Sequence, residues 1–332
     1  MKKNLFSAMV LAVAAAAFSG CGGAGGDGTI TLSYANFPPP ETFPCVQMER
    51  WKEEVERRTG GKVRVRTYPG GTLLEAKAVF DGVVAGTADI GNFAMSYQPG
   101  RFPVSEAADQ PHFFASAERA SLKLAELLRR EDPEEFREVK VLTAFTCPPG
   151  VIMSTKPVDD PTDLGHMTLR SSGTSLEAVR LLGAAPVAMP QSDVPDALHK
   201  GVVRGVVSSA EVLKDMNYAL TCKHVAKARL PVTSFAVVMN MERWKSLPPD
   251  VQEVLEGLYE EQAEWTGRYV DGHAEEALRW AAEEQGVEIS EPTEEQFRVL
   301  RERLEPLSAA YVERVAAKGI DGRRLLEFLR KE

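Results

Sequence analysis

The chain has 332 residues, with 39 Lys and Arg against 48 Asp and Glu, which gives a formal net charge of −9 at pH 7. This length predicts about two domains, since single hydrophobic cores stop growing at roughly 250 residues, and the 44% hydrophobic content excludes a largely disordered chain and a polytopic membrane protein. The acidic balance argues against nucleic acid as a partner, because binding to a phosphate backbone needs clustered Lys and Arg.

The first segment has the features of an export signal. Lys2 and Lys3 precede an apolar stretch over residues 5–18, which is shorter than the about 20 residues that a membrane-spanning helix needs. We therefore predict a signal peptide at residues 1–20. The next residue, Cys21, ends a Phe-Ser-Gly-Cys sequence that resembles a bacterial lipobox, and residues 21–28 then form a flexible tether that a lipid anchors to the membrane. An ordinary cysteine beside a generic cleavage site is the alternative.

From Thr29 the chain alternates between strand-like and helix-like segments. Period-two patterns predict strands at 30–34 and 63–67, and a helix over 42–58 lies between them and ends at Gly60-Gly61. A second helix over 73–85 and a short strand over 89–93 complete a β-α-β-α-β run. Such runs build a mostly parallel sheet covered by helices, with ligands at the carboxyl ends of the strands.

A second set of alternating elements follows the first. Its segments lie at 139–145, 167–170, 176–182 and 202–208. Pro148-Pro149-Gly150 marks a first crossing between two domains, and an apolar strand over 230–239 is a candidate for the return crossing.

The C-terminal part of the chain is predicted to be helical. Residues 250–285 contain no proline, and as one helix they would extend about 54 Å, enough to brace two lobes. Gly267 and Gly272 argue against an unbroken helix. Residues 293–332 are predicted to form two or three short amphipathic helices. The resulting division places 29–148 plus 236–280 in a first lobe and 149–235 plus 281–332 in a second.

Familiar catalytic and metal-binding patterns are missing from the sequence. The five histidines are at least 25 residues apart, and no Walker loop, G-x-S-x-G elbow or C-x-x-C pair occurs. Cys45, Cys147 and Cys222 can form at most one internal disulfide. We expect no metal and no cofactor, and a binding protein rather than an enzyme, although a tethered enzyme that uses acidic residues remains an alternative.

Several motifs together resemble the TRAP transporter solute-binding proteins, the DctP-like family. The order and spacing of the matching segments are similar to that family over nearly the whole chain from Ile30 onward. The segments are 61–74 (GKVRVRTYPGGTLL), 84–91 (VAGTADIG), 161–170 (PTDLGHMTLR), 182–187 (LGAAPV), 197–205 (ALHKGVVRG), and Trp244 with Leu247-Pro248.

The resemblance implies an α/β fold of two lobes, a type II-like periplasmic binding protein with hinge-crossing strands and a long bridging helix. It also implies a periplasmic receptor that closes around an organic acid and delivers it to a permease of a small and a large membrane subunit, driven by an ion gradient. A receptor linked to an ABC transporter or a sensor is the alternative within the binding class.

The resemblance places the main carboxylate-binding residue of the family at Arg170. A planar guanidinium suits this role, because it offers parallel N–H donors to both carboxylate oxygens and keeps its charge. A surface arginine at a strand end is the alternative. The other positions that the resemblance assigns to the solute site are Asn36, Glu75, Asn92, Phe93 and Tyr97 in the first lobe, and Gln191, Ser208 and Ser209 in the second.

Each of these positions also has a structural interpretation. Asn36 suits a turn and Glu75 suits the start of a helix. Phe37, Phe93 and Tyr97 are candidates to stack on a ring of the solute, although core packing is the more usual role of any single aromatic side chain.

The sequence also departs from the family pattern. Arg204 replaces the usual acidic residue of a Val-Asp-Gly motif, and Ser208 occupies the place of a frequent ligand amide. The segment 147–150 lacks the second arginine that sialic-acid binders carry there. These changes argue against sialic acid or a C4-dicarboxylate as the solute, because polar partners in a pocket decide which solute is accepted. Arg204 either supplies a second positive charge or faces outward.

Overall fold

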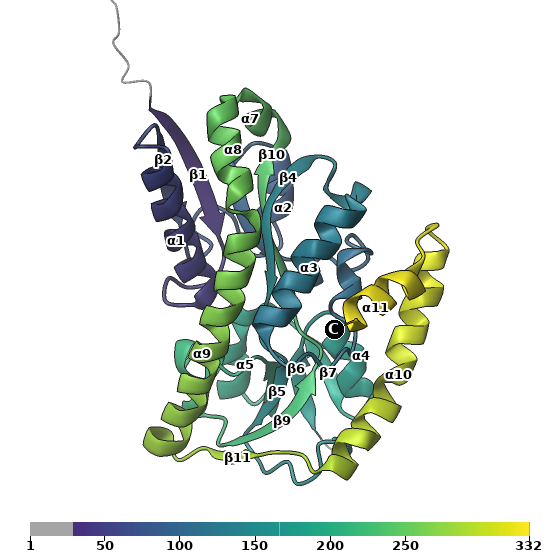
Figure 1. Ribbon diagram of the computed structural model, residues 1–332. Helices are drawn as coiled ribbons and strands as arrows, with labels where there is room; N and C mark the ends of the chain where they lie inside the picture. Colours follow the sequence, from purple (N-terminus) through teal and green to yellow (C-terminus); the bar gives the residue numbers. More distant parts are fainter. Residues whose placement is uncertain (1–28, 166, 332) are drawn as a thin grey trace, which may run out of the picture.

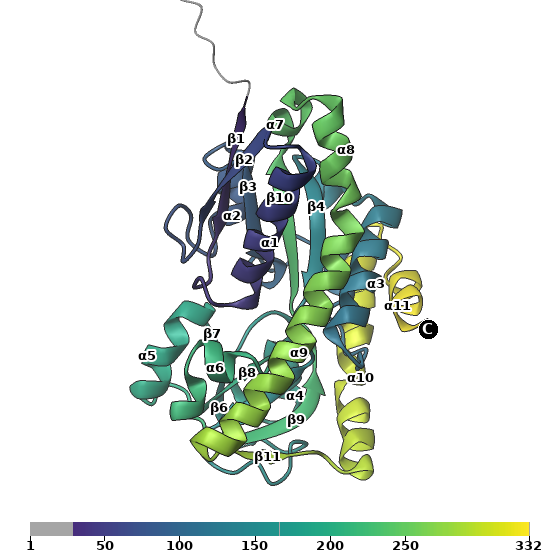
Figure 2. The ribbon, with the colours of Figure 1, turned by 60° about the vertical axis from the view of Figure 1, so that its left-hand side comes forward.

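The computed structural model describes residues 29–165 and 167–331. The predicted signal peptide, Cys21 and the tether at 21–28 lie outside these residues. Two mixed β-sheets form the centres of two lobes, as Figures 1 and 2 show. This arrangement confirms the predicted two-lobed α/β fold.

The first lobe is built on a five-stranded sheet of order β2-β1-β3-β10-β4. Its strands are β1 (Ile30–Asn36), β2 (Val63–Tyr68), β3 (Ile90–Ala94), β4 (Val139–Thr146) and β10 (Ser234–Asn240). The surrounding helices are α1 (Phe43–Arg58), α2 (Val79–Val84), α3 (Ala117–Glu131), α7 (Met241–Ser246) and α8 (Pro249–Gly257). Buried apolar side chains cover both faces of the sheet, with Phe80 and Leu124 on one face and Trp51 and Leu255 on the other.

The second lobe is built on a six-stranded sheet of order β11-β9-β5-β8-β6-β7. Its strands are β5 (Gly150–Ser154), β6 (Thr168–Ser171), β7 (Ala185–Ala188), β8 (Gly205–Ser208), β9 (His224–Leu230) and β11 (Glu288–Ser290). Helix α4 (Thr174–Leu181) packs on one face of this sheet, and α5 (Val194–His199) and α6 (Val212–Asp215) pack on the other.

The polypeptide crosses between the lobes at two adjacent places. β4 leads to β5 through Cys147-Pro148-Pro149, and β9 leads to β10 through Pro231-Val232-Thr233. The two crossings are hydrogen-bonded, because the Cys147 N–H donates to the Thr233 carbonyl at 3.0 Å. The predicted strand over 230–239 is therefore two strands with a crossing between them. β10 runs antiparallel to β3 and β4, and β5 runs antiparallel to β8 and β9, because the backbone crosses in one direction and returns in the other.

Helix α9 (Tyr259–Gln285) runs along both lobes, and Figure 2 shows its path. The predicted helix over 250–285 is interrupted at Leu258, between α8 and α9, and not at Gly267 or Gly272. Gly267 has a packing reason: a Cβ there would lie 2.4 Å from the Cα of Glu118, so α9 and α3 approach each other too closely for a side chain. The predicted bridging helix is present.

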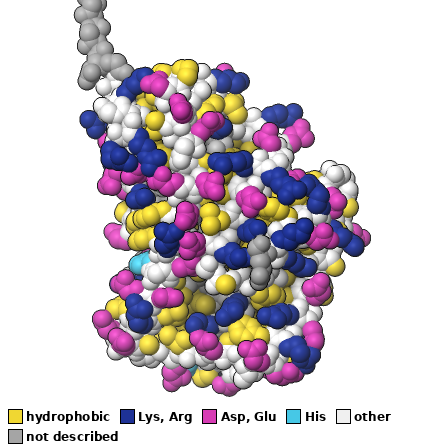
Figure 3. Space-filling model, in the orientation of Figure 1, with side chains coloured by type: hydrophobic (Ala, Val, Ile, Leu, Met, Phe, Trp, Pro, Cys, Tyr) yellow, Lys and Arg dark blue, Asp and Glu magenta, His cyan; other side chains and the backbone are white. Residues whose placement is uncertain are grey.

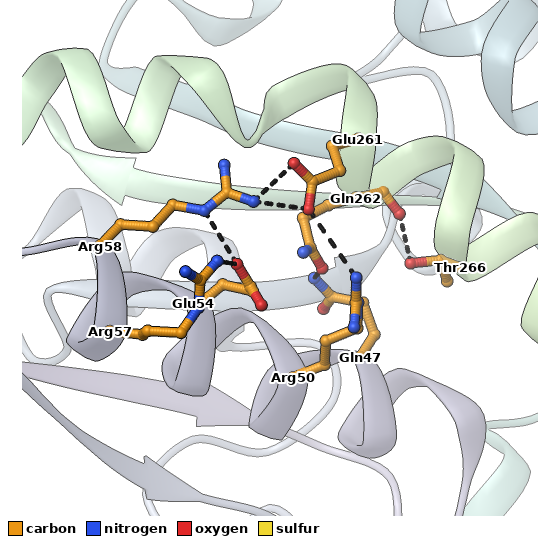
Figure 4. A network of polar contacts seen from close by, with 8 residues as sticks. All are labelled: Gln47, Arg50, Glu54, Arg57, Arg58, Glu261, Gln262 and Thr266. Atoms are coloured by element: carbon orange, nitrogen blue, oxygen red, sulfur yellow. Dashed lines mark hydrogen bonds and ion pairs between the residues drawn. The ribbon is translucent and has the colours of Figure 1, made fainter.

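A polar network fastens α9 to α1 of the first lobe (Figure 4). The Arg58 guanidinium donates to both carboxylate oxygens of Glu261 at 2.8 and 2.7 Å, and its Nε donates to Glu54 at 2.8 Å. Beneath these exposed groups, the buried Gln47 donates to Gln262 at 3.4 Å. At its other end, α9 packs Ala274 and Ala281 into the core of the second lobe.

Two further helices follow α9. Helix α10 (Glu294–Ala316) buries Leu300 and Leu304 in the core of the second lobe and Tyr311 in the core of the first. Helix α11 (Gly322–Arg330) then packs beside α3. We propose that α11 moves with the first lobe, rather than with the second as the division at residue 281 placed it.

The helix predicted over 73–85 is shorter in the structure, where α2 begins only at Val79. Residues 70–77 form turns, and both Gly70 and Gly71 adopt positive φ. Among the described helices, none combines the length and the apolar character needed to cross a membrane. The face drawn in Figure 3 carries basic and acidic side chains interspersed rather than a basic patch.

Candidate functional site

A cavity lies between the two lobes beside the hinge crossings. It encloses about 710 Å³, including its open mouth. The first lobe contributes Phe37, Pro38, Pro39, Thr42, Phe43, Pro44, Ala94, Tyr97 and Phe235 to its lining, and the crossings contribute Cys147 and Thr233. The second lobe contributes Arg170, Ser172, Gln191, Ser192, Ser208, Ser209, Glu211, Val212, Asp215 and Met216. The cavity therefore lies at the carboxyl ends of β1, β3, β6, β7 and β8, where open α/β sheets bind ligands.

Arg170 lies on β6, between β7 and β8, and is 2% exposed. Its Nε and Nη2 both donate to the Met189 carbonyl, at 3.0 and 2.8 Å. Among the described residues, no carboxylate oxygen lies within 4.0 Å of its nitrogens. The guanidinium is thus oriented by a neutral group at the cavity wall and keeps further N–H donors without an acidic partner.

Gln191 joins the two lobes beside this arginine. It begins the short 3-10 helix η4 (Gln191–Asp193), and its backbone N–H donates to the Tyr97 hydroxyl of the first lobe at 3.2 Å. Its side-chain amide donates to the Ser208 hydroxyl at 3.3 Å, at the end of β8. Tyr97, Gln191 and Ser208, which the resemblance placed at the site, therefore form one hydrogen-bonded group around the cavity.

The wall formed by the first lobe is aromatic. Phe37 lies 5.5 Å from Tyr97 and 6.5 Å from Phe235, measured between ring centroids, and Phe43 lies 5.7 Å from Phe235. Phe43 comes from the first residue of α1 and Phe235 from the second residue of β10, so three chain segments build this wall. Aromatic faces provide apolar contact area for a ring or an aliphatic body of a solute.

The wall formed by the second lobe also carries two carboxyl groups. Glu211 is 2% exposed, its Oε1 accepts a hydrogen bond from the Ser209 hydroxyl, and burial raises its pKa to about 7. Asp215 accepts a hydrogen bond from His273 Nε2 of α9 at 2.7 Å, and this bond raises the pKa of the histidine. Glu211 Oε2 and Asp215 Oδ2 have no hydrogen-bond partner among the described residues.

Four residues that the resemblance assigned to the site lie away from the cavity lining. The sheet register sets Asn36 of β1 beside Asn92 of β3, and the two buried side chains hydrogen-bond to each other at 3.0 Å. Phe93 is 1% exposed and packs in the core of the first lobe. Glu75 is exposed on the turn before α2. Phe93 therefore has the core position that its structural interpretation expects, whereas Asn36 lies in a strand rather than a turn and Glu75 lies on a turn before α2 begins at Val79.

Arg204 faces outward. It is exposed and precedes β8, whose opposite end reaches the cavity. It therefore supplies no second positive charge to the cavity wall.

Sequence reasoning missed several lining residues, among them Phe43, Ser172, Glu211, Asp215 and Phe235. Phe43 and Phe235 are apolar residues inside a helix and a strand, where a core role is the ordinary expectation. For Glu211 and Asp215 the sequence offered a weak indication of a role in the site, because both residues follow closely on the strand end at Ser208-Ser209. An acidic residue at that place is equally expected at a helix start.

The cysteines and acidic residues form no further reactive centre among the described residues. Cys45, Cys147 and Cys222 are buried free thiols, and no group of three potential metal ligands occurs in the same part of the chain. Burial raises the pKa of Cys147, which lines the cavity at the hinge, to about 12. A thiol with such a pKa stays protonated and unreactive near neutral pH.

Most of the sequence is similar to known proteins. Residues 34–314 match the family model described as bacterial extracellular solute-binding protein, family 7. The C4-dicarboxylate-binding periplasmic protein DctP of Rhodobacter capsulatus is 26% identical over 297 residues, which cover 88% of this chain and 89% of that protein.

Two solved structures are similar over most of the chain. A TRAP periplasmic solute binding protein from Desulfovibrio salexigens, an open complex with the C-terminus of a symmetry mate in its ligand-binding site, is 47% identical with a TM-score of 0.83, over 90% of this chain and 94% of that chain. A marine metagenome TRAP solute binding protein specific for aromatic acid ligands, in complex with metahydroxyphenylacetate, is 27% identical with a TM-score of 0.86, over 91% and 97% of the two chains.

Proposed function

Since the chain belongs to the TRAP solute-binding proteins of bacterial extracellular solute-binding protein family 7, we propose that it captures an organic acid between its lobes through Arg170. The observation that supports this proposal most directly is the environment of the Arg170 side chain, that is, its burial and its hydrogen bonds. Arg170 is almost fully buried at the cavity wall, hydrogen-bonded only to the neutral Met189 carbonyl among the described residues, and without an acidic partner there.

Burial of an unpaired guanidinium is unfavourable, because the charge loses water without gaining a counter-charge. A carboxylate in the cavity supplies the missing counter-charge and accepts two parallel N–H bonds. Gln191, Ser208 and Ser209 stand on the same wall and offer further polar contacts. The negative net charge of the protein does not attract an anion from a distance, so the local charge of Arg170 performs the capture.

The aromatic wall favours an acid with an apolar or ring-shaped body. Phe37, Phe43, Tyr97 and Phe235 offer faces rather than hydrogen bonds to most of the solute. The structurally similar marine protein binds aromatic acids, and the Desulfovibrio protein holds the C-terminus of a symmetry mate, a group that ends in a carboxylate. The groups bound by both relatives support a monocarboxylate as the solute, with its body against this wall.

The receptor delivers its solute to a permease with a small and a large membrane subunit, driven by an ion gradient. This role follows from family membership. Uptake of the labelled solute into vesicles that hold both subunits is expected to require this protein and an ion gradient but no ATP. Dependence on ATP would instead favour an ABC-type receptor, and signalling without uptake would favour a sensor module.

The family consists of receptors rather than enzymes, and we propose that the acid leaves unchanged. After prolonged incubation with the protein, the acid recovered should have its original mass. A new product that forms in proportion to protein concentration would favour the alternative of a periplasmic enzyme.

We further propose that Cys21 is lipidated, so that the receptor remains attached to a membrane on the periplasmic side. The lipobox-like residues 18–21 and the Gly-rich segment 22–28 support an anchor followed by a tether. Cys21→Ser is expected to release the protein into the soluble periplasmic fraction and to abolish labelling by a radioactive fatty acid. Equal labelling of both forms would contradict the anchor.

The direct test of the proposed function is to identify what the protein carries. Mass spectrometry of material released from freshly purified, denatured protein should detect an organic acid at close to one molecule per protein molecule. Added back to ligand-free protein, that acid should raise the melting temperature by mass action. Release of a compound without an acidic group would contradict the proposal.

A further inference from the structure

The cavity has an acidic pole that carboxylate capture does not explain. Glu211 directly precedes the short helix α6 and Asp215 is its last residue, and both line the same cavity as Arg170. One oxygen of each carboxyl group is occupied, by the Ser209 hydroxyl and by His273 respectively. Glu211 Oε2 is buried and has no hydrogen-bond partner among the described residues.

A half-buried carboxylate of this protein shows how such a group is paired when its role is structural. Glu135 accepts the Val104 N–H on Oε2 at 2.9 Å and the Ser105 N–H on Oε1 at 3.0 Å. Both of its oxygens are therefore paired with the backbone. A buried carboxylate oxygen left without a donor is strongly unfavourable, and Glu211 belongs to the cavity lining, so a solute in the cavity is the expected source of the donor that its Oε2 lacks.

The charges around the cavity are kept apart rather than paired with one another. The nitrogens of Arg170 lie farther than 4.0 Å from the oxygens of Glu211 and Asp215. Asp215 already has His273 beside it, whereas Glu211 has the hydroxyl of Ser209 and no cationic group within the same distance among the described residues. The cavity thus presents a cationic group and an acidic group to whatever occupies it.

We propose that the solute carries, in addition to its carboxylate, a hydroxyl or N–H group that donates a hydrogen bond to Glu211. This inference rests on the proposed function, because it assumes that Arg170 holds the carboxylate. In this arrangement the carboxylate lies at Arg170, the body lies against Phe37 and Tyr97, and the donor reaches Glu211.

The same arrangement disfavours dicarboxylates. A second carboxylate at the acidic pole would face Glu211 and Asp215, and like charges at close range oppose binding. This protein should therefore reject the class of solute that the name of its Rhodobacter relative specifies.

Matched acids can test the inference by isothermal titration calorimetry on the mature protein. The probes are phenylacetate, its 2-, 3- and 4-hydroxy and aminomethyl derivatives, and its 2-, 3- and 4-carboxy derivatives. At least one derivative with a donor should bind the wild type about tenfold tighter than phenylacetate, a difference of about 1.4 kcal/mol, and every carboxy derivative should bind more weakly than phenylacetate.

Variants of Glu211 then test whether this residue causes the preference for acids with a hydrogen-bond donor. Glu211→Met should reduce the ratio of the affinities for the preferred derivative and for phenylacetate to about one. Glu211→Gln keeps the shape of the side chain and serves if the Met variant does not fold. It should reduce the same ratio, because the hydrogen bond loses its charge assistance. The control Glu283→Gln, at an exposed position of α9, should retain the wild-type ratio.

The outcomes separate the two proposals. If phenylacetate binding depends on Arg170 but no donor improves it, or if the preference survives in both Glu211 variants, the role of Glu211 is refuted and carboxylate capture stands. If the acids bind equally well to Arg170→Ala, the proposed function fails and this inference fails with it. If none of them binds the wild type, the placement of the solute body against Phe37 and Tyr97 is refuted, and this inference with it. Release of an acid without a donor group from the purified protein would likewise overturn the inference.

Discussion

At the scale of single residues, Arg170 in the proposed binding wall is oriented before a solute arrives. Arg170 is fixed on a strand and by two hydrogen bonds to Met189, so its remaining N–H donors do not need to be ordered on binding. Preorganisation of this kind raises affinity because it removes the entropy cost of fixing a long side chain. Lysine would keep the positive charge at this position but lose the planar fork.

Asp109 provides a prediction about stability. Burial raises its pKa from the ordinary 3.8 to about 8, with a further increase from the charge of Glu106, and Ser234 donates a hydrogen bond to it. Between pH 4 and pH 8 the folded protein therefore keeps a proton that the unfolded chain has lost. The free energy of unfolding should fall as pH rises through this window, by up to about 1.4 kcal/mol per pH unit from this group.

The variant Asp109→Asn has no titratable group at this position, so its free energy of unfolding should fall less steeply as pH rises. Urea unfolding at pH 5, 6, 7 and 8 measures the difference between the two proteins. His112, whose pKa burial lowers to about 4, changes stability in the opposite direction below pH 6.5, so the comparison with the variant is the informative quantity. Parallel slopes for wild type and variant would show that Asp109 is ionised in the folded protein.

The site could be predicted only where one residue and its local motif carry the function. Arg170 follows a recognisable segment, and the structure places it at the cavity. Asn36 and Asn92 were also predicted at the site, but the sheet register turns them toward each other. Phe235 and Glu211 reach the cavity only because the hinge and β8 bring distant segments together, which no local pattern encodes.

At the scale of elements, the loop between β6 and α4 brings the lobes into contact. Gly173 adopts φ +55°, and a Cβ there would lie 2.7 Å from the Cβ of Ser96 in the first lobe. Together with the bond between Tyr97 and Gln191, this contact fixes how closely the lobes approach beside the cavity. A side chain at position 173 would hold them apart.

Gly173→Ala should therefore weaken binding of the solute by about tenfold. Backbone strain at a positive φ would also lower stability by about 1–2 kcal/mol, so a second variant is needed to separate the two effects. The double variant Gly173→Ala/Ser96→Gly removes the steric contact but keeps the strain, and it should recover most of the affinity. Equal binding by the wild type and Gly173→Ala, or no recovery in the double variant, would contradict this role of the contact.

The elements of the fold were largely predictable, whereas their interruptions were not. Alternating apolar residues marked β1 and β2, and the proline-free stretch marked α8 and α9. The mixed strand directions follow from the double crossing of the hinge, which is a property of the whole backbone path. Gly267 looked like a helix breaker, yet its lack of a side chain permits α9 to lie against α3.

At the scale of the whole molecule, two helices as well as two strand crossings connect the lobes. α9 is fastened to the first lobe by the contacts of Arg58, Glu261 and Gln262 and buries Ala274 and Ala281 in the second. α10 passes from the core of the second lobe to that of the first, and Pro306 lies between Leu304 and Tyr311. A proline inside a helix removes a backbone hydrogen bond and favours a bend there.

We expect these connections to limit the lobes to motions about the hinge crossings, so that opening and closing would take place over the cavity. A solute that bridges the lobes would then stabilise the closed arrangement by its contacts with both walls. In the proposed function, capture of the solute thus depends on one ionic contact, between the Arg170 guanidinium and the carboxylate of the solute.

The most direct test is isothermal titration calorimetry with the acid released from the purified protein. Arg170→Ala should lose at least about 3 kcal/mol of binding free energy, more than a hundredfold in affinity, whereas Arg180→Ala at an exposed site on α4 should bind as the wild type does. Thermal unfolding of the ligand-free proteins checks that both variants fold. Affinity for Arg170→Ala within twofold of the wild type would contradict the account.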